Sequence, residues 1–330
     1  MELSKYMVKT GRFFIRHRLL LVYAFLAIAM IIYTDGFFNA FNLASILGLS
    51  SIMGFLVIGE ALVIITGGID LSVGNVASFS SVICAWTMLT FADKLPTSIV
   101  VVITVLFGIL CGVFVGFING FSVAKLKITP LIATLGGFWI AVGLAEYIFS
   151  GVPTPLAIKS FSLLGRLKVL KIFPLPFIFF SFCSLLVFII LEKMRIGRYV
   201  YAVGGSKDAA YLSGIKTERV LIWCYTLSGI FSAIGGIFLA AWMSVGDSRG
   251  AMGYEFIAIT AVVMGGFSLF GGEGNLWDAV IGIITLQTIR KIIPHLMIST
   301  FYEDGIVGAI LLIAVLLSVT RIRRHGHSKA

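Results

Sequence analysis

The sequence predicts an all-α polytopic membrane protein that forms a single domain, residues 1–330, with about ten transmembrane helices. Of the 330 residues, 59% are hydrophobic and only 12% are charged, and the mean hydropathy is +1.07. So few polar groups cannot cover a water-soluble surface. Apolar stretches of about 17 to 25 residues recur, which is the length a helix needs to cross the hydrocarbon core. The stretch VVVITVLFGILCGVFVGFI at 100–118 is apolar throughout, which excludes the alternating pattern of a transmembrane β-barrel.

The apolar runs place the expected helices in order at 19–35, 43–66, 72–90, 97–121, 129–150, 174–192, 219–242, 255–270, 275–293 and 302–320. The first run follows five basic residues without a small-residue cleavage site, so we expect it to remain as an uncleaved span. Basic residues of membrane proteins collect in cytoplasmic loops. With the N-terminus inside, 17 of the 25 basic residues fall in inner segments and 8 in outer ones. This bias favours two cytoplasmic termini and explains the net charge of +10 without nucleic acid.

One loop fits this topology poorly. The segment 151–173 carries four basic and no acidic residues, yet it lies outside in this arrangement. One miscounted span would move it to the other side of the membrane.

The sequence offers no catalytic or metal-binding motif. It has no G-x-x-x-x-G-K-[ST] phosphate loop, no nucleophile elbow and no H-E-x-x-H pair, so energy for any transport must come from another polypeptide. The four cysteines fall within predicted spans without metal-like spacing and are interpreted as packing residues: Cys84, Cys111, Cys183 and Cys224. We therefore expect no enzyme activity, metal or cofactor in this chain.

Small residues recur every fourth position in two predicted spans. Gly108, Gly112, Gly116 and Gly120 share one helix stripe, and so do Ser228, Ser232, Gly236 and Ala240. Such stripes let helix backbones approach closely. The motif GGIDLSVG at 67–74 also has a weak echo at 265–272, which fits either an internal duplication or a chance likeness of two glycine-rich turns.

One inner loop, residues 193–218, is long and polar. Within it Ser206 is a suitable N-cap, Asp208 lies in the first turn, where the helix dipole favours an anion, and Gly214 suits the position after the C-cap. These residues predict a helix of about two turns at 207–213. Isolated helices this short are marginal in water, so we expect a partner to dock on it.

Five separated stretches together indicate a family. GGIDLSVG (67–74), TPLIATLGG (129–137), IGRYVYAVGGSKDAAYLSGI (196–215), TLSGIFSAIGGIFLA (226–240) and GYEFIAITAVVMGGFSLFGGEG (253–274) resemble the membrane subunit of ribose- and xylose-type ABC sugar importers. The resemblance covers about residues 40–320. It implies a type II ABC-importer-like permease in the bacterial inner membrane that passes a pentose or hexose inward. The same machinery with a nucleoside, an inositol or a furanosyl signal molecule as cargo is an alternative, and a cation-coupled carrier or channel is a further one.

The resemblance also implies partners. These are a second permease chain, identical or related, a cytoplasmic ATPase that binds ATP and magnesium, and an extracytoplasmic sugar-binding protein that docks on loops including 151–173 and 243–253. The loop helix becomes the coupling helix seated in the ATPase. The ATPase-coupling candidates are Gly204, Gly205, Ser206, Asp208, Ala209, Ala210, Ser213 and Gly214.

The GGIDLSVG motif buries a carboxylate between two apolar runs. An acidic side chain facing lipid at a helix centre costs about 2.5 to 3.5 kcal/mol, so Asp70 is expected to face protein. We favour a role in which the glycines bend the chain and Asp70 accepts hydrogen bonds from freed amides or from Ser72. The alternative is contact with sugar hydroxyls.

Polar groups on apolar helices are candidates to line a sugar pathway or to bond between helices. With the glycines of the bend they are Glu60, Gly67, Gly68, Asp70, Ser72, Asn75, Asn119 and Thr134, and Gln287 joins them. Three aromatic residues could stack on a sugar face, although the 28 phenylalanines of the chain make lipid contact the default: Phe138, Trp139 and Phe149.

Overall fold

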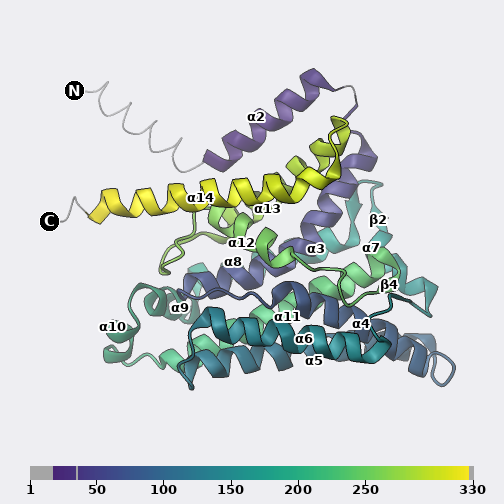
Figure 1. Cartoon of the computed structure of the whole chain (residues 1–330), viewed down its shortest axis with the longest axis horizontal. Helices are drawn as coiled ribbons and strands as arrows, with labels where there is room; N and C mark the ends of the chain where they lie inside the picture. The colour runs from purple at the N-terminus through teal and green to yellow at the C-terminus, as the bar shows by residue number, and fades with distance from the viewer. Residues whose placement is uncertain (1–17, 35, 327–330) are drawn as a thin grey trace.

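The computed structural model describes residues 18–34 and 36–326, so the basic segment before Arg18 and residues 327–330 lie outside it. Each predicted apolar run contains a helix (Figure 1). These helices are α2 (Arg18–Tyr33), α3 (Ala40–Ile65), α4 (Val73–Phe91), α5 (Thr97–Ala124), α6 (Pro130–Phe149), α8 (Leu175–Lys193), α11 (Thr217–Met243), α12 (Tyr254–Met264), α13 (Leu276–His295) and α14 (Glu303–Gly326).

Among the described residues six helices, α3, α4, α5, α6, α8 and α11, are long and apolar enough to cross a membrane. The chain is therefore a multi-pass helical membrane protein. The predicted span 255–270 is too long, because α12 ends at Met264. Gly265 caps it and Gly266 adopts a positive φ of 85°, which stops the helix there.

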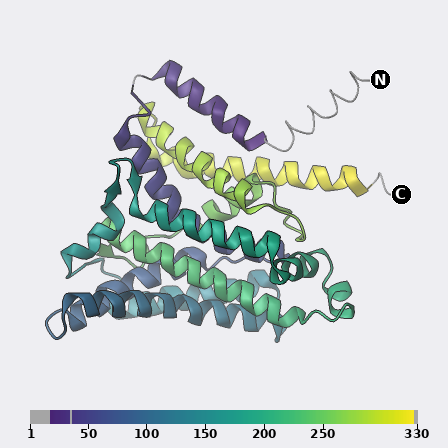
Figure 2. The same ribbon diagram turned by 180° about the vertical axis from the view of Figure 1, so that it is seen from behind.

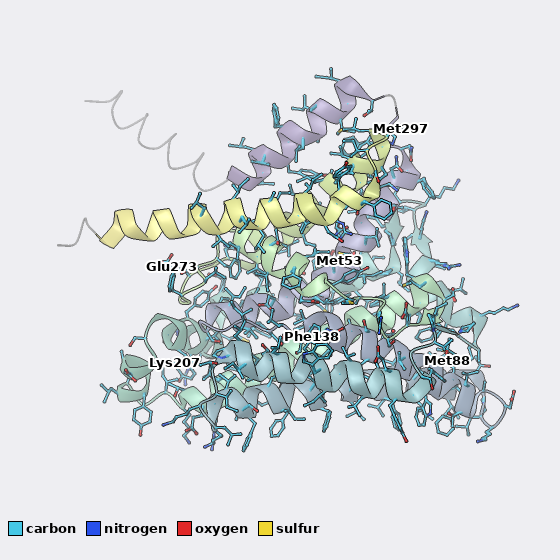
Figure 3. The ribbon with its side chains drawn as sticks, viewed as in Figure 1. Met53, Met88, Phe138, Lys207, Glu273 and Met297 are labelled. Carbon is cyan, nitrogen blue, oxygen red and sulfur yellow. The ribbon has the colours of Figure 1, made fainter. Side chains whose placement is uncertain are left out.

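The connections alternate between two ends of the helix bundle. Lys207 and Glu273 lie at one end, and Met88 and Met297 lie at the other (Figure 3). We call the first the α10 end, after the short helix α10 (Lys207–Leu212), and the second the opposite end. The first turn of α2 and the last turn of α14 both point toward the α10 end, as seen from both sides (Figures 1 and 2).

Helix α11 lies at the centre and packs against α5, α3 and α4. The predicted glycine stripe of α5 makes this contact, because a Cβ at Gly112 would collide with the backbone of Gly229 and one at Gly120 would lie 2.8 Å from the Cα of Ile222. Gly236 of α11 is equally close to the backbone of Ala77 in α4. Helix α11 therefore contacts α5 and α4 through helix backbones, whereas apolar side chains such as Phe55, Phe180 and Phe267 fill the rest of the core.

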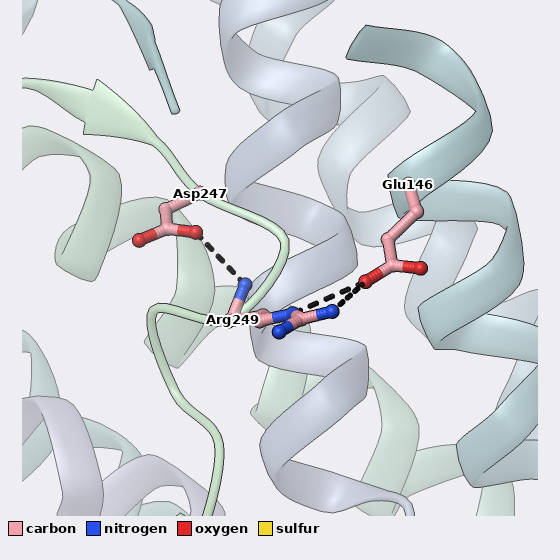
Figure 4. Close-up of polar contacts among 3 residues, drawn as sticks. All are labelled: Glu146, Asp247 and Arg249. Carbon is pink, nitrogen blue, oxygen red and sulfur yellow. Dashed lines mark hydrogen bonds and ion pairs between the residues drawn. The ribbon is translucent and has the colours of Figure 1, made fainter. Parts of the chain in front are cut away.

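Short elements close the opposite end. They are η1 (Lys159–Phe161), α7 (Ser162–Arg166), η2 (Thr300–Tyr302) and two antiparallel pairs, β1 (Thr154–Pro155) with β4 (Val245–Gly246) and β2 (Lys168–Val169) with β3 (Phe173–Pro174). Nearby, the Arg249 guanidinium donates to Glu146 at 2.9 and 3.1 Å, while its backbone amide donates to Asp247 (Figure 4). The β1–β4 pair ties the predicted outer loops 151–173 and 243–253 together, and the Arg249–Glu146 contact ties the second loop to α6.

The four cysteines are unpaired, as their positions predicted. Cys84 and Cys224 are buried, and Cys111 and Cys183 are partly buried.

Candidate functional site

The GGIDLSVG motif forms a break between α3 and α4. Helix α3 ends at Ile65, and Gly67 adopts a positive φ of 78°, which a residue with a Cβ rarely adopts. A Cβ at Gly68 would collide with the hydroxyl group of Tyr225 in α11. The two glycines are therefore required by backbone conformation and by close approach, respectively.

Asp70 is 1% exposed and holds this break together. Its Oδ1 accepts from the backbone amide of Ser72 at 3.0 Å and from the Ser72 hydroxyl at 2.6 Å, and its Oδ2 accepts from the Ser228 hydroxyl at 2.8 Å. The backbone amide of Asp70 donates to Glu60 Oε1 at 3.2 Å. Both carboxylate oxygens of Asp70 are thus engaged within the chain, which is the geometry of the bend-fixing hypothesis.

The network reaches two more helices. Asn119 of α5 donates from Nδ2 to the Ser72 hydroxyl at 2.8 Å, and Thr134 of α6 donates to the carbonyl oxygen of Ile69 at 3.2 Å. Asn75 is buried in the first turn of α4. The structure therefore brings all eight predicted pathway or bend residues to one place.

Gln287 lies elsewhere. Its Nε2 donates to the sulfur of Met53 at 2.6 Å, beside a separate cavity that also contains the ion pair of Arg290 and Glu303. Phe149 also lies away from the break, packed against the clusters around Phe161 and Phe79.

A second interruption lies beside the first. After β4 the chain runs along α4 without helical structure. The backbone amide of Asp247 donates to the Ser81 hydroxyl at 3.1 Å, and that of Ala251 donates to the Ser78 hydroxyl at 2.9 Å. Helix α12 then begins next to the start of α4, since a Cβ at Gly74 would collide with the Glu255 carboxylate. Two helix N-termini, each with partial positive charge, therefore lie together.

Helices α3 and α12 end with the same turn. Gly67 donates to the carbonyl of Ile64, and Gly266, with a φ of 85°, donates to the carbonyl of Val263. Each following residue donates one position further back, to Val63 and Val262. Gly67 is thus structurally equivalent to Gly266, one residue away from the pairing with Gly265 in the sequence echo.

A cavity of about 540 Å³ opens beside these two N-termini. It is lined by Leu71, Leu135, Phe138, Trp139, Met252, Gly253, Glu255, Phe256 and Asp304. Leu71 belongs to the first break, and Phe138 and Trp139 come from α6. The two carboxylates of the lining, Glu255 and Asp304, come from α12 and α14. Aromatic faces and carboxylate oxygens can contact a molecule that is rich in hydroxyl groups, and a lining without a cation offers no partner to an anion.

Several buried polar atoms around the breaks have no hydrogen-bond partner among the described residues. They include Glu60 Oε2, Glu255 Oε2, Asn119 Oδ1 and the Tyr225 hydroxyl. Unpaired polar atoms are costly in an apolar interior, so they are available to water or to a polar ligand. Within residues 18–34 and 36–326, no group of three or more His, Cys, Asp or Glu side chains is placed to hold a metal ion.

Helix α10 has the predicted caps. The Ser206 hydroxyl accepts from the amide of Ala209 at 3.2 Å, Asp208 lies in the first turn, and Gly214 follows Ser213 with a φ of 82°. Ala210 is 4% exposed and packs inward against α5 and α11, whereas Ala209 is exposed.

Two large apolar side chains on α10 face outward. Tyr211 is 70% exposed and Leu212 is 85% exposed. Together they form a small apolar patch on an otherwise polar segment.

Residues 42–315 match the family described as "Branched-chain amino acid transport system / permease component". The chain belongs to this permease family. The permease is 35% identical to the ribose import permease protein RbsC of Bacillus subtilis over 88% of this chain and 89% of that protein. It is 36% identical to the L-arabinose transport system permease protein AraH of Escherichia coli over 93% and 91%, and 32% identical to RbsC of Haemophilus influenzae over 93% and 94%. No solved structure shows significant similarity.

Some residues of the permease site were not predicted from the sequence. Ser228 was part of a small-residue stripe, and nothing connected it with Asp70, which is 158 residues away. Tyr211 and Leu212 could have been noticed as large apolar residues within a capped polar loop. Glu255 and Asp304 could have been noticed as acids in the first turns of apolar helices.

Proposed function

We propose that this permease is the membrane-spanning subunit of an ATP-driven importer that passes a pentose or hexose inward from an extracytoplasmic binding protein. The names of the relatives support a sugar cargo. The observation that carries the proposal is the cavity beside the two helix breaks, with its aromatic and carboxylate lining. Carboxylate oxygens accept hydrogen bonds from sugar hydroxyls, and Trp139 offers a face for the sugar ring.

The lining also favours a sugar over the cargo in the family's name. A branched-chain amino acid is a zwitterion, so its ammonium group could contact Glu255 or Asp304, but its carboxylate would find no lysine or arginine among the lining residues. A carboxylate removed from water without a partner is costly. A neutral sugar carries no such group.

The exposed side of the cavity supports a second permease chain. Asp304 is exposed and Glu255 lines the same cavity, on a face that would otherwise meet lipid. An acidic side chain in lipid is expensive, so this face borders an aqueous path. A second copy, or a related chain, closes that path from the other side.

In this proposal the α10 end is cytoplasmic, in the inner membrane of a bacterium, and α10 seats in a separate ATPase that holds ATP and magnesium. The permease itself is not an enzyme. Exposed Tyr211 and Leu212 provide the contact. Closure of the ATPase moves α10 and switches the cavity between outward and inward access, which is a rigid-body transition between two states.

The test uses the complex retrieved from native membranes through a tag on this chain and placed in lipid vesicles with its binding protein. We expect ATP-dependent uptake of ribose, arabinose or another pentose or hexose, and no uptake of leucine. Leucine uptake would contradict the sugar assignment. Accumulation by the permease alone, driven by a sodium or proton gradient, would identify a secondary carrier instead.

Trp139→Ala tests the cavity directly. Loss of one aromatic platform is expected to raise the sugar concentration for half-maximal uptake about two- to tenfold, because aromatic contacts are worth about 0.5–1.5 kcal/mol beyond their area. Trp223→Ala is the matched control, since Trp223 is 64% exposed and Trp139 is 65% exposed, but Trp223 does not line the cavity. Equal effects of the two substitutions would contradict a sugar site at Trp139.

A further inference from the structure

The helix that leads into α10 contacts the start of the first break directly through its backbone. This helix, α9 (Arg195–Gly205), reaches Ile65 and Gly272 at Gly204. A Cβ at Gly204 would collide with the carbonyl oxygen of Ile65 and would lie 2.5 Å from the amide nitrogen of Gly272. That amide in turn donates to the Ile65 carbonyl at 2.8 Å. Three segments distant in sequence therefore meet at one point, which we call the glycine junction.

The other glycines of the junction are equally close. A Cβ at Gly271 would lie 2.8 Å from the carbonyl oxygen of Gly204 and 2.8 Å from the amide nitrogen of Gly67. A Cβ at Gly272 would lie 2.9 Å from the Cα of Gly205. Since no side chain separates the three backbones, none can absorb a displacement by changing rotamer.

A second contact fastens α9 to the α12–α13 connection. The Tyr201 hydroxyl donates to the carbonyl oxygen of Gly274 at 2.8 Å. Burial, with the nearby Glu192 carboxylate, raises the pKa of Tyr201 to about 12, so the phenol stays protonated and remains a donor. Helix α9 is thus held to the turn both at its end and one helical turn earlier.

The junction leads to both sides of the cavity. Gly67 begins the break that carries Asp70 and Leu71, and residues 265–275 follow α12, which carries Glu255 at its other end. On its far side, α9 meets α10 at Ser206, which caps both helices.

We propose that Gly204 is a positioning residue that transmits movement of α10 at once to the two turns that follow α3 and α12, through direct backbone contact at the glycine junction. The inference rests on the proposed function, in which α10 receives the movement of an ATPase. It adds the route by which that movement reaches the cavity.

The test compares sugar uptake per ATP hydrolysed in vesicles that contain the assembled complex. Gly204→Ala is expected to lower this ratio about tenfold or more, within the usual range of coupling between sites, while ATP hydrolysis continues. Gly205→Ala serves as a neighbouring comparison, because a Cβ there meets nothing within 4 Å, and it should keep more than half of the ratio. Gly143→Ala in α6, which also has open space, is the unchanged control.

A milder variant covers the case in which Gly204→Ala fails to assemble. Tyr201→Phe removes one hydrogen bond from the same contact and is expected to lower uptake per ATP about two- to tenfold. A normal ratio in Gly204→Ala, or in Tyr201→Phe where the former does not assemble, would overturn the proposal.

A second measurement tests the role of Gly204 independently of which molecule is transported. Backbone hydrogen exchange of residues 66–72 and 268–274 is followed in the permease with and without bound ATPase. We expect exchange in both turns to change on ATPase binding in the unmodified chain and not in Gly204→Ala or Tyr201→Phe. Unchanged exchange on ATPase binding in the unmodified chain would overturn the proposed route through the glycine junction. Exchange that changes on ATPase binding, in a complex that takes up no sugar, would support the route and contradict only the sugar assignment.

Discussion

Asp70 shows how a carboxylate can lie in an apolar core without a cation beside it. Three hydrogen bonds from Ser72 and Ser228 surround it, and its own amide is held by Glu60. Hydrogen bonds to charged groups are worth about 1.5–3 kcal/mol each, which offsets the cost of removing the charge from water. Through its carboxylate and its amide, Asp70 thus connects α3, α4 and α11.

This arrangement predicts unequal effects of two substitutions at Asp70. Asp70→Ala leaves three buried donors without an acceptor and is expected to lower the free energy of unfolding by about 3 kcal/mol or more. Asp70→Asn keeps an acceptor for Ser72 and should cost about 1 kcal/mol. Thermal unfolding of the purified chain in detergent measures both, with exposed Asp93→Ala as the control. Equal losses for Ala and Asn would mean that the charge itself is required.

At the scale of elements, the caps of α10 could be read from the sequence because capping is local. Ser206, Asp208 and Gly214 lie within nine residues and perform the predicted roles. The orientation of the helix could not be read in the same way. Ala210 faces inward and Leu212 outward, and this depends on where α5 and α11 pack.

Leu212→Asp tests whether α10 docks on a partner. An exposed apolar anchor at the centre of an interface is worth about 2 kcal/mol or more, so we expect association with the ATPase to weaken at least about 30-fold. Association is measured by retrieval of the ATPase with tagged permease and by titration in detergent.

Leu170→Asp provides the control, because Leu170 is 79% exposed but lies between β2 and β3 at the opposite end. Retained ATPase binding in Leu212→Asp would exclude this surface of α10 as the docking site.

The positions of the helices were predictable, whereas their partners were not. Long apolar runs specify a helix wherever they occur, which is why every predicted run contains one. Contacts between distant runs have no comparable signal. Like the other pathway candidates, Gln287 is a polar residue on an apolar helix. It faces Met53 because α13 packs against α3 there.

At the scale of the molecule, the division into two ends predicts which residues share an aqueous compartment. In a variant without the four native cysteines, single cysteines replace Lys207 and Glu273 at the α10 end, or Val152 and Met297 in the predicted outer connections. In intact cells a membrane-impermeant maleimide is expected to label positions 152 and 297 only. In inside-out vesicles it should label positions 207 and 273 only.

Labelling of position 207 in intact cells would reverse the proposed orientation. Labelling of positions 152 and 207 from the same side would contradict the arrangement of the connections. It would also revise the placement of the basic loop 151–173.

The short length of α12 has a consequence for how the protein folds. Eleven residues are too few for a helix to partition into a bilayer by itself, and the segment before it runs beside α4 with amides held by Ser78 and Ser81. Bare amides cannot rest in hydrocarbon without such acceptors. Residues 247–264 therefore fit the hydrocarbon core only when they pack against α4, which makes the first half of the chain a template for folding of the second.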